Sequence, residues 1–177
     1  MRDNGRSDSN VGIEPGQIWL IETPGTGGLT SLDRSVLRRA DVVLYERALA
    51  PLADALLAGR YAEPLSAEGE EGAPAIAPRA LKLARDGWSV VQLVRPSHQW
   101  RRRLRGIVAE LGLLSETGKL AIRLTADPFQ IRDAHLCDLG KFVDGAGEGE
   151  PLTVIVGPIA GSASAAAYAV TANGLAG

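Results

Sequence analysis

The sequence predicts a doubly wound α/β protein, with an open, mostly parallel β-sheet that carries helices on both faces. Segments with strand-like and helix-like patterns alternate from residue 17 onwards. The strand-like segment "DVVLY" at 41–45 is almost continuously apolar, which is typical of a strand covered on both faces. A chain of 177 residues that is 45% hydrophobic is long enough to bury one core. In such a fold, ligands bind at the carboxyl ends of the strands.

The first strand–helix unit shows this pattern clearly. A β-rich segment at 17–22 ends before a glycine-rich turn. The helix predicted at 32–40 then places Leu32, Val36 and Leu37 on one face. Strand, glycine turn and helix therefore follow one another in the order of a βα unit.

The later elements continue the alternation. They are predicted, in order, as strand 41–45, helix 51–59, strand 60–65, surface loop 66–75, helix 78–87, strand 88–94, helix 99–112, strand 119–124, helix 132–143, loop 145–150, strand 151–156 and helix 161–170. Pro51 suits a first helical turn, and Gly59 and Gly87 suit helix ends. Pro64 indicates that its strand is short or lies at an edge of the sheet.

Composition argues against several classes of partner. With 19 basic and 21 acidic residues, the net charge of −2 creates no overall field for nucleic acid or an anionic membrane surface. The lone cysteine, Cys137, cannot form an internal disulfide, and His98 and His135 lack metal-ligand spacing. The uncharged stretch 151–177 is interrupted by glycine and proline, unlike a membrane span. We expect a cytoplasmic protein without a metal site.

The turn after the first strand is a candidate ligand loop. Its amides, from Gly25 to Gly28, could face an anion at the start of the following helix. The glycine spacing does not match a dinucleotide-binding fingerprint, although Glu46 ends the second strand as an acidic residue would there. An ordinary tight βα turn and a Rossmann-like nucleotide site both remain open.

Two further groups of residues could contact a ligand. Arg95 and the cluster Arg101–Arg105 suit a carboxylate- or phosphate-bearing ligand, or else are solvated, and one interleaved aromatic, Trp100, does not indicate nucleic-acid binding. His98 follows the fourth strand, where it is either a site residue or a surface histidine. Asp127 follows the fifth strand, where it fits a turn or a site.

Residues 17–51 resemble the start of proteins of the tetrapyrrole methylase family, especially the uroporphyrinogen-III C-methyltransferases. The sequence of this segment is "QIWLIETPGTGGLTSLDRSVLRRADVVLYERALAP". Pro24 and Gly25 match a P-G pair in the family's first turn, and "ADVVLYER" is similar to its "ADVVLYDRL". "ALKLARDGWSVVQL" resembles a later helix–strand step of the family, and "RLTADPF" retains its D-P-F.

The resemblance implies an S-adenosylmethionine-dependent methylation of a tetrapyrrole, uroporphyrinogen III, on the route to sirohaem and corrins. It implies a donor cleft between two α/β domains, lined here by Pro24 and Gly25, with Asp127 and Pro128 as further cofactor-binding candidates. The carboxylates of the substrate would give Arg95 or Arg101 something to bind. No residue is assigned a catalytic role.

Departures from the family pattern predict reduced function. Ile21 and Thr23 stand where the family's first turn has two glycines, and Thr26 stands where it has an acid. Because β-branched side chains obstruct close approach to a backbone, we expect weak or absent S-adenosylmethionine binding and lost or reduced activity. The alternative is a non-catalytic binding or partner subunit that associates with a complete methylase or forms a homodimer.

The expected domain organisation follows from these segments. Residues 1–16 are predicted as a disordered tail, and residues 17–114 as the methylase-like α/β domain. Residues 115–177 are either a continuation of that domain or a reduced second lobe.

Overall fold

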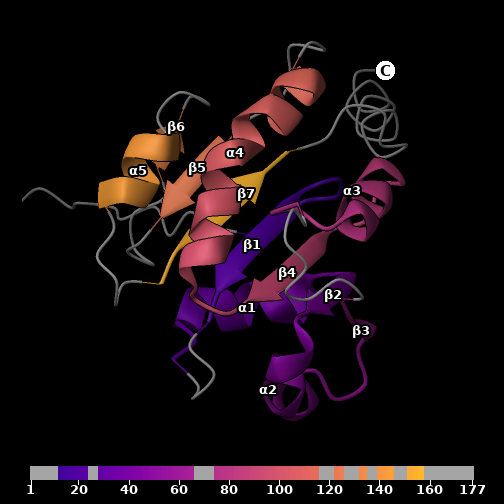
Figure 1. Ribbon diagram of the computed structural model, residues 1–177. Coiled ribbons are helices and arrows are strands. Elements are labelled where there is room, and N and C mark those ends of the chain that lie inside the picture. Colours follow the sequence, from indigo (N-terminus) through magenta and orange to yellow (C-terminus); the bar gives the residue numbers. More distant parts are fainter. Residues whose placement is uncertain are drawn as a thin grey trace, which may run out of the picture.

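The strands form one mixed β-sheet in the computed structural model, which describes residues 12–23, 28–65, 74–115, 122–125, 132–134, 139–145 and 151–157. Within these residues the sheet has seven strands in the order β3-β2-β4-β1-β7-β5-β6 (Figure 1). The strands are β1 (Ile18–Glu22), β2 (Val42–Tyr45), β3 (Ala62–Pro64), β4 (Val90–Val94), β5 (Ile122–Thr125), β6 (Arg132–Ala134) and β7 (Thr153–Val156). The helices are α1 (Ser31–Arg39), the 3-10 helix η1 (Arg47–Leu49), α2 (Ala50–Leu56), α3 (Pro78–Arg85), α4 (His98–Ser115) and α5 (Leu139–Gly145).

The direction of the strands confirms the α/β class but corrects the expectation of a mostly parallel sheet. Strands β1 to β4 pair in parallel, as helical crossovers require. Strand β7 is antiparallel to both β1 and β5, and β6 is antiparallel to β5. Only residues 126–131 join β5 to β6, and a parallel crossover needs a dozen residues or more. The second half of the sheet is therefore antiparallel.

Each face of the sheet is covered by its own set of helices. Ile18 and Leu20 of β1 belong to one buried cluster, together with side chains of α3, α4 and α5. Trp19 and Ile21 belong to the other cluster, with side chains of α1 and α2. The alternation follows from the two-residue period of a strand, and burial on both sides explains why β1 and β2 read as apolar runs.

Local sequence signals account for the element boundaries. Thr30 and Asp33 form a capping box at the start of α1, in which the Asp33 amide donates to Thr30 Oγ1 at 3.1 Å and the Thr30 amide donates to Asp33 Oδ2 at 2.9 Å. Gly59 and Gly87 adopt φ of 80° and 91° after α2 and α3, a conformation that favours glycine. The predicted helix-stop glycines are therefore confirmed.

The short strand β3 lies at an edge of the sheet, as Pro64 indicates. Its Glu63 accepts a hydrogen bond from Arg79 Nε at 2.7 Å. This bond from Arg79 lowers the pKa of the Glu63 carboxyl, with a smaller contribution in the same direction from Tyr61. A proline and a charged pair at an exposed edge hinder pairing with another chain.

Two predicted boundaries differ from the structure. Part of the helix predicted at 132–143 is strand β6, and α5 begins only at Leu139, because backbone pairing with β5 overrides the local helical pattern. Residues 12–16, assigned to the tail, contact the sheet: Ile13 packs on the cluster beneath α1, and the Gly16 amide donates to the Trp88 carbonyl at 3.2 Å.

The segment after Ser115 contributes strands to the same sheet as the first hundred residues, since β7 pairs with β1. The helix predicted at 161–170 lies outside the described residues, and the domain assignment of 115–177 stays a prediction. Among the helices of the described residues, none has the length and apolar character that crossing a bilayer requires.

Candidate functional site

At the carboxyl ends of β1, β2 and β4, the chain continues into helices that lie on different faces of the sheet. Strands β1 and β2 lead to α1 and α2 on one face, whereas β4, which lies between them, leads to α4 on the other. In Figure 1, α4 crosses the sheet in front of β1 and β7. A place where neighbouring strands lead to helices on opposite faces is called a topological switch point, and open α/β sheets bind ligands there. The candidate site is therefore this carboxyl edge.

A buried ion pair lies at the centre of the carboxyl edge. Glu22, the last residue of β1, accepts hydrogen bonds from Arg101 Nε at its Oε1 and from Arg101 Nη2 at its Oε2, both at 2.8 Å. The Leu152 amide, just before β7, donates to Glu22 Oε2 at 3.0 Å. The side chain of Glu22 is fully buried and that of Arg101 is 11% exposed. The pair therefore ties together β1, α4 and the residue before β7.

The buried carboxylate of Glu22 was not identified from the sequence. Glu22 ends the segment "IWLIE" directly before Thr23 and the glycine-rich turn. A charged residue that closes an apolar strand at this edge is the signal that could have identified it, because a buried carboxylate needs a cationic partner. Its partner, Arg101, could not be paired with it from local spacing.

The β-branched residues at the end of β1 belong to the framework of the site. Ile21 is fully buried in the cluster beneath α1 and pairs in register with Leu93. Thr23 is also fully buried, and its amide donates to the Val94 carbonyl at 2.9 Å. Ile21 thus packs into the core, and Thr23 continues the pairing of β1 with β4 up to the turn.

A second ion pair lies at the same edge, between β2 and β4. Arg95 follows β4, and its Nε donates to Glu46 Oε2 at 2.9 Å. The Glu46 amide donates to the Leu93 carbonyl at 3.2 Å, which fixes its backbone beside β4. The side chain of Arg95 is 55% exposed, and that of Glu46 is 18% exposed. This pair is therefore open to solvent, in contrast to the first.

The start of α4 carries the remaining candidates near this edge. Ser97 caps the helix, since its Oγ accepts a hydrogen bond from the Trp100 amide at 3.1 Å. His98 is exposed as the first residue of the helix. Trp100 is buried in the core, so it is not placed to stack on a nucleic-acid base.

The arginines of α4 have different surroundings. Arg102 is exposed, and Arg105 pairs with Asp144 of α5 while its side chain stays 51% exposed. These two residues fit the solvated alternative for the cluster. Arg101 does not, because it is buried against Glu22.

Other candidates from the sequence lie outside the described residues. These are Pro24, Gly25, Asp127, Pro128 and Cys137. The roles that the resemblance assigns to Pro24, Gly25, Asp127 and Pro128 stay predictions. In the part of the chain that the structure describes, histidine, cysteine and acidic side chains form no group of three that could hold a metal ion.

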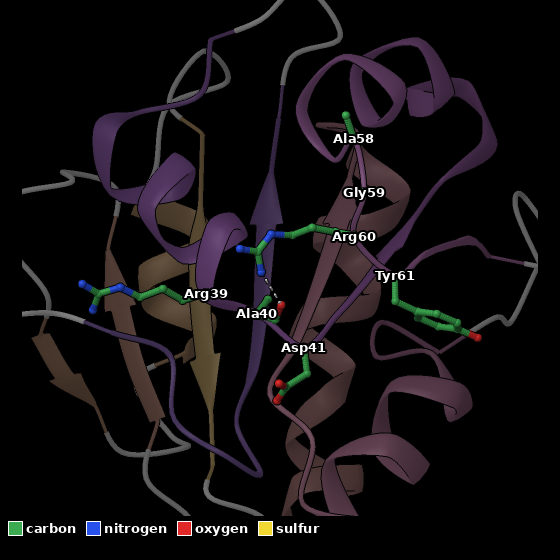
Figure 2. Close-up of a pocket in the computed structure, with 7 residues that line it drawn as sticks. All are labelled: Arg39, Ala40, Asp41, Ala58, Gly59, Arg60 and Tyr61. Carbon is green, nitrogen blue, oxygen red and sulfur yellow. Dashed lines mark hydrogen bonds between the residues drawn. The ribbon is translucent and has the colours of Figure 1, made fainter.

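A cavity of about 520 Å³ lies at the amino ends of the strands, between the end of α1 and the turn after α2. Its lining residues are Arg39, Ala40, Asp41, Ala58, Gly59, Arg60 and Tyr61. Figure 2 shows that the side chains of Arg39 and Tyr61 point in opposite directions, whereas Arg60 reaches towards Ala40. Arg60 Nη1 donates to the Ala40 carbonyl at 3.4 Å, which suits a cation at a helix carboxyl end.

The acid in this cavity already has partners. Asp41 Oδ2 accepts hydrogen bonds from the Ser89 hydroxyl at 2.6 Å and from the Ser89 amide at 2.8 Å. These bonds link the starts of β2 and β4. The polar groups of the cavity therefore stabilise the fold and do not converge on one point, so the carboxyl edge remains the better candidate site.

Comparison of the sequence with models of known protein families gives no match, and no curated protein sequence matches it. The likeness to tetrapyrrole methylases thus stays a prediction that rests on the motifs quoted above.

Proposed function

We propose that the chain is a tetrapyrrole methylase-like protein in which S-adenosylmethionine-dependent C-methylation of uroporphyrinogen III is reduced or lost. The donor would bind at the carboxyl edge, next to the loop that contains Pro24 and Gly25. The switch point between β1 and β4 supports this location, since the loop follows β1 directly. Arg95 at the same edge is exposed and suits a carboxylate of such a substrate, whereas Arg101 is buried against Glu22.

The observation that carries the loss of function is the buried pair between Glu22 and Arg101. Two charged side chains and the Leu152 amide occupy the space between the end of β1 and the start of α4. A methyl donor must hold its sulfonium in line with the accepting carbon, and this needs an accessible crevice. A buried ion pair in this space would oppose binding of the donor there.

Calorimetric titration of the full chain with S-adenosylmethionine tests the proposal. We expect a dissociation constant weaker than about 100 μM, or no measurable heat. In parallel, incubation with uroporphyrinogen III and the donor, followed by mass spectrometry, should show little methylated product above a reaction without protein. Low-micromolar donor binding with rapid methylation would contradict the proposed loss.

The same buried ion pair favours a second candidate, a non-catalytic methylase-like subunit that binds a complete methylase or another copy of itself. Size-exclusion chromatography with light scattering separates the candidates. A monomer that transfers methyl groups to a porphyrinogen would exclude the subunit function. A stable dimer without donor binding would favour it.

A further inference from the structure

We infer that Arg95 is the group at the carboxyl edge that binds a carboxylate ligand, and that Arg101 is a structural residue that does not contact it. This inference rests on the proposed function in one respect, namely that the carboxyl edge is the ligand-binding edge. It goes further because the sequence cannot distinguish the two arginines, whereas their contacts and exposure can.

Arg101 forms a buried ion pair that belongs to the structure of the fold. Both its Nε and its Nη2 are bonded to Glu22, and its side chain is 11% exposed. Moving it to a ligand would leave the fully buried Glu22 carboxylate without its cation, which is strongly unfavourable. A ligand carboxylate in this position gains too little to offset that loss.

Arg95 is restrained by Glu46, but much of its side chain is exposed to a ligand in solvent. In the described part of the chain its guanidinium makes one hydrogen bond, from Nε to Glu46 Oε2 at 2.9 Å. Its two Nη groups make none, and more than half of the side chain is exposed. The edge of the guanidinium formed by Nη1 and Nη2 therefore remains open to solvent.

The chemistry of that open edge favours a carboxylate. Two parallel N–H groups match the two oxygens of a carboxylate, and hydrogen bonds between charged groups are the stronger ones. Glu46 restrains the guanidinium from the neighbouring strand, so less side-chain freedom is lost on binding. Because Glu46 also balances the charge of Arg95, affinity should come from the directed bonds more than from long-range attraction.

Position distinguishes Arg95 from three other exposed arginines, Arg60, Arg102 and Arg105. Arg95 directly follows β4, which lies between β2 and β1 and leads to the opposite face of the sheet from these two strands. Arg102 and Arg105 lie further along α4, and Arg60 lies near the amino ends of the strands. Arg102 is therefore a suitable control, since it is an exposed arginine of the same region outside the switch point.

The test is calorimetric titration of the full chain with citrate, a tricarboxylate, beside its uncharged trimethyl ester. We expect citrate to bind with a dissociation constant of about 1 mM and the ester not to bind. Arg95→Gln should weaken citrate binding at least about tenfold, because charge-assisted hydrogen bonds are lost. Arg102→Gln should leave it within about twofold of the unmodified chain, and both variants should keep the same unfolding midpoint.

Equal weakening by the two variants, binding of the ester as strong as that of citrate, or no citrate binding at all would overturn the inference. These outcomes are independent of the donor. Failure of the proposed function would appear in the titration with S-adenosylmethionine and in the methylation assay, whereas the assignment of Arg95 is decided by citrate alone.

Discussion

Replacing Arg101 by methionine is expected to lower the free energy of unfolding by about 3–5 kcal/mol. Among the residues that the structure describes, the substitution leaves the fully buried Glu22 carboxylate with the Leu152 amide as its one remaining donor. An uncompensated buried charge is far more costly than the small net gain from an intact buried pair. Urea denaturation followed by circular dichroism would measure the change.

Arg102→Met is the matched control, because it removes the same side chain from the next position of α4, where it is exposed. It should change the unfolding free energy by less than about 0.5 kcal/mol. The double variant Glu22→Leu, Arg101→Met should recover part of the loss, since no buried charge remains, although the Leu152 amide then lacks an acceptor. A loss below about 1 kcal/mol in Arg101→Met would show that the pair is not buried as described.

Replacing Leu152 by alanine is the second substitution with a large expected effect, a loss of about 2–5 kcal/mol. Leu152 is fully buried in the cluster beneath α4, directly before β7. The variant keeps the backbone amide that donates to Glu22, so it tests packing and not the hydrogen bond. Thermal and urea unfolding would both report the change.

Leu56→Ala provides the comparison for Leu152→Ala. Leu56 ends α2 and is 37% exposed, so the same chemical change removes much less buried surface. We expect a loss below about 1 kcal/mol. Similar losses for the two variants would mean that the segment before β7 does not belong to the core.

Local patterns predicted much of the first half of the fold. The strand at 41–45, the helix face with Val36 and Leu37, and the edge strand with Pro64 are confirmed. Period, capping residues and turn residues act over a few positions, and each of these elements depends mainly on such signals.

The candidate site was predictable only in outline. The position of Arg95 at the end of β4 followed from the strand–helix alternation. The buried state of Arg101 did not, because Glu22 precedes it by 79 positions and no local period connects them. All four predicted cofactor residues, at positions 24, 25, 127 and 128, lie outside the described residues, so their roles stay predictions.

Alternation of strand and helix in the amino-acid sequence is enough to establish an α/β protein with its carboxyl edge as the place to look for a ligand. Tertiary contacts were needed for the direction of β5, β6 and β7, for the start of α5, and for the different surroundings of Arg95 and Arg101. Strand direction depends on which backbone groups pair across the sheet, and the burial of a charge depends on a partner brought from a distant segment. Neither is encoded in the spacing of neighbouring residues.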